Sequence, residues 1–142
     1  MTTCSVPQRV TVGFVIVALV LTTADTHASE ACGLVVARHI AAGSPGAVAK
    51  LFVAVGSDSQ RALVDLVKAV GEISSLREAT APRFKDFARM SVLSHGLAAN
   101  YASVVQRVDA TSSTLGPIQI EVAIAPGSVC LLLAVHVDAA RR

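Results

Sequence analysis

Serine, histidine and carboxylate side chains, which carry most nucleophilic and acid-base catalysis, are scattered along this sequence of 142 residues. No serine lies in a Gly-x-Ser-x-Gly motif. His136 and Asp138 form the most suggestive pair, because alternate residues of a β-strand lie on one face. A pair of side chains does not by itself define a site, since the remaining groups must come from the fold. We therefore expect no enzymatic activity, and His136 is the first position to inspect for a site.

Metal and nucleotide sites find no better support in the sequence. His39, His95 and His136 show no local pairing such as His-x-x-x-His. The stretch 43–46, Gly-Ser-Pro-Gly, lacks the lysine and the preceding strand of a phosphate-binding loop. The net charge of +2 is too small to indicate a nucleic acid or an anionic membrane as partner. The sequence thus predicts no metal and no cofactor.

The first 28 residues have the three parts of a secretory signal peptide. Arg9 lies in a short n-region, an apolar run covers residues 10–21, and Thr26 and Ala28 frame His27 ahead of a cleavage point. The apolar run is far shorter than the roughly 20 residues of a membrane-spanning helix, which disfavours an uncleaved anchor. We expect cleavage before Ser29, which leaves residues 29–142 as a single globular domain in a secreted or periplasmic location.

The expected cleavage also determines which cysteines remain in the mature chain. Cleavage would remove Cys4 and leave Cys32 and Cys130, an even number in an oxidising compartment. We predict that these two residues form one disulfide, which would close a loop of about a hundred residues and stabilise the fold by roughly 4 to 5 kcal/mol. Two free thiols and an intermolecular bridge are the alternatives.

The clearest structural pattern covers residues 118–138. Apolar residues alternate with Gln119, Glu121 and Ala123 up to a turn at residues 126–127, and a mostly apolar run follows. This period of two predicts a β-hairpin. A four-residue loop would set Ile124 opposite Val129, with the two strands paired in step from there. The second face of the hairpin carries Cys130, so that helices are expected to cover both faces of the hairpin.

Helical patterns precede the hairpin. Spacings of three and four residues between apolar positions, together with Gly and Pro stop signals, predict helices. The segment 97–108 fits a helix best, with a strand as the alternative, and residues 109–117 are expected to form a loop. The predicted helices are 32–42, 45–55, 58–73, 80–96 and 97–108. Gly71 weakens the third of these and marks either a close contact or an early end.

Together these elements predict an α+β fold, with several helices packed on a C-terminal antiparallel β-hairpin or a small three-stranded sheet. The order of elements is similar to that of cone-shaped α+β folds, in which helices pack across a curved sheet and enclose an apolar pocket. No sequence motif accompanies this similarity of layout.

We expect a non-enzymatic binding or interaction domain whose partner is another protein. A homodimer formed through a sheet edge is compatible with this expectation. The alternative is a carrier of a small apolar ligand, held in a pocket between the hairpin and the helices. The candidate lining residues are Phe84, Phe87, Tyr101 and His136.

Overall fold

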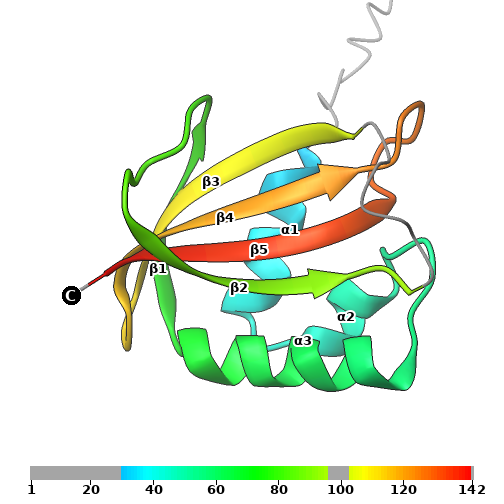
Figure 1. Cartoon of the computed structure of the whole chain (residues 1–142), viewed down its shortest axis with the longest axis horizontal. Coiled ribbons are helices and arrows are strands. Elements are labelled where there is room, and N and C mark those ends of the chain that lie inside the picture. Colours follow the sequence, from blue (N-terminus) through cyan, green and yellow to red (C-terminus); the bar gives the residue numbers. More distant parts are fainter. Residues whose placement is uncertain (1–29, 96–102, 142) are drawn as a thin grey trace, which may run out of the picture.

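The computed structural model describes residues 30–95 and 103–141. Within these residues, helices come first and strands follow (Figure 1). All of the strands belong to one antiparallel sheet in the order β1-β3-β4-β5-β2. The elements are α1 (Cys32–Ala41), α2 (Pro45–Ala49), α3 (Ser57–Val70), β1 (Ile73–Ala79), β2 (Phe87–Leu93), β3 (Val104–Ser112), β4 (Gly116–Ile124) and β5 (Leu132–Ala140).

The predicted fold class is wrong, because a five-stranded sheet dominates the described chain rather than several helices on a hairpin. The segment 80–96, expected as a helix with Phe84 and Phe87 on one side, contains a linker and strand β2. Residues 104–108 begin β3, and the expected loop 109–117 is mostly strand on both sides of a short turn. In each case pairing with a strand distant in sequence overrides a local helical spacing.

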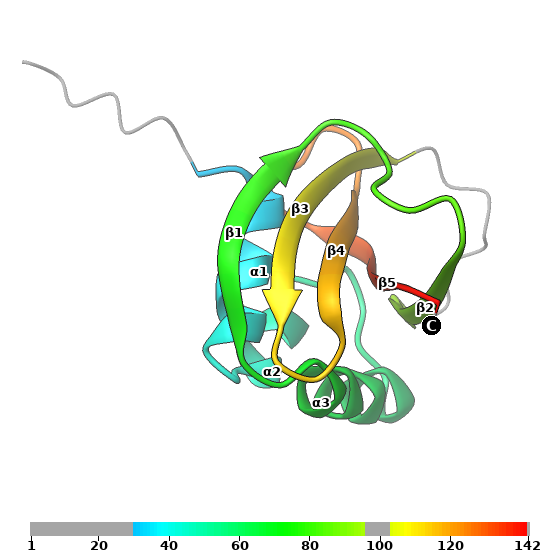
Figure 2. The ribbon, with the colours of Figure 1, turned by 90° about the vertical axis from the view of Figure 1, so that its left-hand side faces the viewer.

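The helices all pack against one face of the sheet (Figure 2). Val36 and Ile40 of α1, and Leu63 of α3, are fully buried against it. The sheet contributes every second residue of its central strands to this core: Val108, Ile118, Ile120, Val122, Val135 and Val137. The expectation of helices on both faces of the hairpin is therefore wrong. Alternation along the central strands separates one buried face from one that the helices leave uncovered.

Helix α3 ends earlier than the apolar spacing predicted. Its C-cap Gly71 has φ of 65° and ψ of −145°, a conformation that essentially only glycine adopts, so Ile73 begins β1 instead of a further helical turn. The last carbonyls of α3 still need donors. The hydroxyl of Ser112 donates to the Val70 carbonyl, and that of Thr114 donates to the Ala69 carbonyl. The turn between β3 and β4 thus completes the end of the helix.

The C-terminal hairpin is present as β4 and β5, but its register differs from the prediction. Val122 pairs with Val135 instead of Leu131, a displacement of four residues. The even displacement keeps Val135 and Val137 on the core face, but a bulge at Ala123 and Ile124 also brings Leu132, predicted on the other face, into the core. The connection covers residues 125–131, because Leu132 bridges to Phe52 and its N–H donates to the Leu51 carbonyl. A contact outside the hairpin therefore decides where β5 begins.

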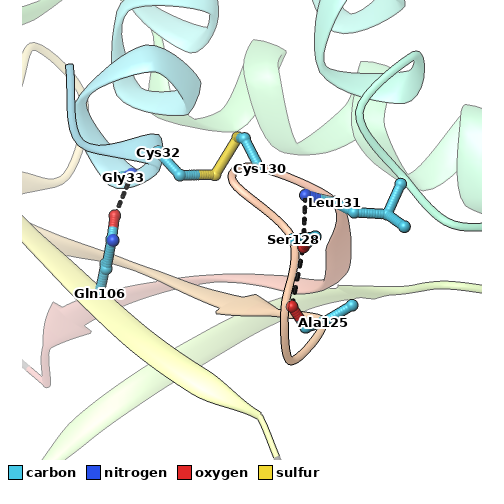
Figure 3. The surroundings of a disulfide bond; sticks show 7 residues. All are labelled: Cys32, Gly33, Gln106, Ala125, Ser128, Cys130 and Leu131. Carbon is cyan, nitrogen blue, oxygen red and sulfur yellow. Dashed lines mark hydrogen bonds between the residues drawn. A yellow bond between two sulfur atoms is a disulfide. The ribbon is translucent and has the colours of Figure 1, made fainter. Parts of the chain in front are cut away.

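Cys32 and Cys130 form a disulfide with 5.2 Å between their Cα atoms, as predicted (Figure 3). It joins the first turn of α1 to the connection between β4 and β5. Beside it, the Gly33 N–H donates to Gln106 Oε1 at 2.8 Å, so a side chain of the sheet caps the helix. None of the helices in the described ranges is long and apolar enough to cross a membrane. The predicted signal peptide, residues 1–28, lies outside the described residues.

Candidate binding face

Among the described residues, one linker crosses the face of the sheet opposite to the helices, here called the open face. Strands β1 and β2 lie at opposite edges of the sheet, so the linker 80–86 has to pass from one edge to the other. Two hydrogen bonds join the linker to Gln119 in β4. The Gln119 Oε1 accepts from the Arg83 N–H at 3.2 Å, and its Nε2 donates to the Ala81 carbonyl at 3.0 Å. The linker lies over one end of the open face, away from the connection between β4 and β5 (Figure 1).

Two rows of charged side chains cross the middle of the open face. Arg89 donates to both carboxylate oxygens of Asp138, each at 2.7 Å, and lies 3.5 Å from Glu121. Arg107 donates to the other oxygen of Glu121 at 3.0 Å. The ion pairs therefore link Arg107, Glu121, Arg89 and Asp138 into a chain of contacts in which the sign alternates, and its members come from four strands. Bidentate pairing of this kind is the strongest form of ion pair between side chains.

The environment of Arg89 is consistent with a structural role. Hydrogen bonding to Asp138 raises the pKa of the Arg89 guanidinium, against the opposing effect of its partial burial, and the charges of Asp138 and Glu121 add to the rise. Within the described residues, no buried side-chain nitrogen or oxygen lacks a hydrogen-bond partner. The charged rows are thus fully paired and offer no exposed charge excess to a ligand.

His136 lies in the same face, and its ring Nδ1 is 2.7 Å from the hydroxyl of Ser91 on β2. Burial lowers the pKa of His136 below its ordinary value, and the nearby Arg89 adds to this, while Glu121 and Asp138 oppose it. The imidazole is therefore neutral at neutral pH. Asp138, which the sequence pairs with His136, is instead engaged with Arg89. In the described part of the chain no carboxylate is hydrogen-bonded to His136, so the three-residue relay of a serine hydrolase is not assembled there.

The other predicted site residues do not gather around His136. Phe84 lies in the linker with the Arg83 guanidinium 5.5 Å from its ring centre, and Phe87 begins β2 with that of Arg89 at 5.3 Å. Phe87 pairs with Ala140, four residues along β5 from His136. Tyr101 lies outside the described residues. Each of the two phenylalanines therefore packs beside an arginine.

At the end of the open face away from the linker, the described side chains are apolar. A third row there joins Val105, Ala123, Ala134 and Leu93 across β3, β4, β5 and β2. Exposed aliphatic side chains continue around this end, from the connection between β4 and β5 and from residue 53, whose N–H donates to the Leu132 carbonyl. We call this set the apolar rim: Val53, Leu93, Val104, Val105, Val129 and Leu131.

The sequence did not identify the apolar rim. Val129 and Leu131 follow the alternating pattern of β5 and were expected on its core face, but the displaced register leaves them in the connection, with Val129 78% exposed. The run of Pro126, Gly127 and Ser128 is the sequence signal that could have indicated a longer connection. The hydroxyl of Ser128 donates to the Ala125 carbonyl and so extends the turn.

Among the described residues there is no group of three or more histidine, cysteine, aspartate or glutamate side chains that could hold a metal ion. The chain matches no protein-family model, no curated protein and no solved structure. The open face and the apolar rim therefore have to be interpreted from their own chemistry.

Proposed function

We propose that the chain is a secreted or periplasmic, non-enzymatic domain that binds another protein through its apolar rim. One observation carries the proposal. Six of the seven large apolar side chains that are exposed in the described residues gather at one end of the sheet, the exception being Val64 on α3. Scattered exposed aliphatic residues need no explanation, but their concentration at one end of a sheet indicates a contact surface.

The surroundings of the apolar rim support the same function. Leu93 is 59% exposed and Val104 54% exposed, so both have substantial apolar area left to remove from water. The next row of the sheet carries Ser91 and His136, which offer neutral hydrogen-bonding groups beside the apolar patch. An apolar centre flanked by polar groups is the usual composition of a protein interface.

Sheet edges support the proposal less well. The β1 edge is interrupted by a bulge between Ser74 and Arg77. At the other edge the hydroxyl of Ser59 donates to the Leu93 carbonyl at 2.9 Å. Bulges and occupied backbone groups both discourage the addition of a further strand. A homodimer formed through a sheet edge therefore has less support than binding of another protein through the apolar rim.

The carrier of a small apolar ligand also has less support. The space between the hairpin and the helices is filled by side chains that are fully buried, including Ile120, Val122 and Val135. An apolar-lined hollow of about 470 Å³ lies between α2 and α3, bounded by Ala49, Val55 and Val64, but it opens to the surface. Ligand carriers bury most of their ligand, which an open hollow cannot do.

The location of the protein can be tested separately from its binding. The disulfide fits an oxidising compartment, and the expected signal peptide would deliver the chain there. Sequencing the N-terminus of exported protein should find Ser29 as the first residue. A full-length product retained in the membrane would contradict the proposed location.

Site-specific photo-crosslinking in the exported fraction of the native host tests the binding surface. A crosslinker at Val129 or Leu93 should yield one discrete adduct that unlabelled protein competes away. The matched control is Val64, which is exposed on α3 away from the apolar rim. Equal adducts from Val64, or no adduct from the two rim positions, would refute the proposal. An adduct of exactly two copies of this chain would replace the foreign partner by a second copy.

A further inference from the structure

A hollow of about 440 Å³ lies at the β1 edge of the sheet, at the end opposite to the apolar rim. It originates in the β1 bulge: Ser74 pairs with Thr111 and Arg77 with Asp109, so Ser75 and Leu76 both face Ala110 alone. Such a bulge bends the strand away from its neighbour. Ser75 has a positive φ of 60°, which is uncommon outside glycine and costs conformational energy. The residues that line the hollow are Ser75, Leu76, Arg77, Arg83, Asp109, Ala110 and Thr111.

Arg83 lines this hollow and is hydrogen-bonded to the sheet. Its Nη1 donates to the Ala110 carbonyl at 3.3 Å and to the Ile118 carbonyl at 3.1 Å, and its backbone N–H donates to Gln119. Within the described residues no carboxylate lies within 4.0 Å of its guanidinium. A guanidinium has N–H groups on three nitrogens, so Nε and Nη2 can still donate to a ligand.

Arg77 supplies a second guanidinium with only a loose partner. Its Nη2 is 4.0 Å from Asp109 Oδ2, and its side chain is 81% exposed. Asp109 has another partner, since its Oδ1 accepts from Gln119 Nε2 at 2.9 Å. Arg89 and Arg107, by contrast, each lie within 3.0 Å of a carboxylate. The hollow therefore concentrates positive charge on a face where the other arginines are neutralised.

We propose that this hollow binds a small carboxylic acid, with its carboxylate between Arg77 and Arg83 and its apolar body along the exposed part of Leu76. Guanidinium groups pair with carboxylates through two parallel hydrogen bonds. Binding would move Arg77 from its 4.0 Å contact to the ligand, while Asp109 keeps its bond to Gln119. The carboxylate of Asp109 repels doubly charged phosphate more strongly than a singly charged carboxylic acid. Phosphate also has no apolar group that could contact Leu76. The site is independent of the apolar rim.

Nuclear magnetic resonance titration with butanoate at constant ionic strength tests this site, with inorganic phosphate and chloride as comparison anions. Butanoate should shift the amide signals of Leu76 and Ala110 in a saturable manner. Arg77→Gln and Arg83→Gln should each weaken binding about tenfold, the effect of losing one charged hydrogen-bonding partner. The control Arg61→Gln removes the same charge from the exposed surface of α3 and should leave binding unchanged.

Arg77→Gln is the decisive variant, because Arg83 also fastens the linker whereas the Arg77 side chain is mostly exposed. Urea unfolding should show that Arg77→Gln keeps the stability of the parent protein. Shifts that do not saturate, that chloride reproduces, or that give the same Kd in Arg77→Gln as in the parent protein would overturn the proposal. Tighter binding of phosphate than of butanoate would overturn the assignment to carboxylic acids. None of these outcomes depends on the crosslinking result at the apolar rim.

Discussion

The imidazole of His136 is half buried in the open face, next to a hydroxyl and within the field of Arg89. Burial is the largest influence and lowers its pKa below 6.5; the charge of Arg89 acts in the same direction. Below pH 6.5 the unfolded chain then binds more protons at this position than the folded protein does. The free energy of unfolding should therefore fall as the pH drops from 6.5 toward the folded pKa, and level off beneath it.

Two measurements check this behaviour. A nuclear magnetic resonance titration of the His136 ring should give a midpoint below 6.5. Urea unfolding above and below this pH should show a smaller acid-induced loss of stability in His136→Gln than in the parent protein. A midpoint at or above 6.5 would mean that Glu121 and Asp138 outweigh burial and Arg89.

Two glycines with positive φ differ both in their steric surroundings and in backbone conformation, because Gly71 also has ψ of −145°. Gly71 (φ +65°) would place a Cβ 2.6 Å from Ser113 Oγ, while Gly43 (φ +67°) has nothing within 4 Å. Gly43→Ala should cost about 1 kcal/mol for the positive φ alone. Gly71→Ala should cost at least about 1 kcal/mol more, because it also displaces the hydroxyl that accepts from the Glu72 N–H. Chemical denaturation of both variants measures the difference, and equal losses would show that neither the ψ of Gly71 nor its contact with Ser113 opposes a side chain.

At the scale of elements, the ion pairs across the open face hold β2 against β5. Asp138 is 4% exposed and bonds Arg89 through both oxygens, so Asp138→Asn should lower the free energy of unfolding by about 2 kcal/mol. The control pair is Arg141 and Asp86, with side chains 66% and 76% exposed. Asp86→Asn should change stability by less than about 0.5 kcal/mol, as expected for an exposed pair.

Urea unfolding of the two variants provides the comparison. A double variant that replaces both Arg89 and Asp138 by apolar residues should recover part of the loss, because no buried charge is then left without a partner. If Asp138→Asn were as mild as Asp86→Asn, the pair would be solvated in solution and would not fix β2.

The elements that the sequence predicted correctly are those defined by local contacts. Helix α1 and the strands of the hairpin have apolar periodicity that agrees with their final burial. The sequence did not predict strand β2, because Phe84, Phe87 and Ala88 match helical spacing. The strand with which it pairs, β5, lies more than forty residues further on. The register of β5 could not be predicted from the sequence either, because the bridge between Phe52 and Leu132 sets it.

The candidate sites also divide into those that the local sequence indicates and those that depend on residues distant in sequence. His136 was found on an uncovered strand face, as its alternation with Val135 and Val137 indicates. Neither the apolar rim nor the hollow beside Arg83 could be predicted, because each forms where residues from several strands meet. The carboxylate partners of Arg89 and Arg107 likewise come from other strands.

At the scale of the whole molecule, the Cys32–Cys130 disulfide closes most of the described chain into one loop, with a sequence separation of 98. It constrains the unfolded state, which the chain-entropy model values at about 4 to 5 kcal/mol. The double variant Cys32→Ser, Cys130→Ser should lose up to this amount in urea unfolding. Its dependence on urea concentration should also steepen, because an unlinked chain exposes more surface on unfolding. Reduced parent protein should unfold at the same urea concentration as the double variant. If the double variant matched the oxidised protein instead, the crosslink would contribute nothing to stability, and its value would lie in holding Val129 and the connection between β4 and β5 in place.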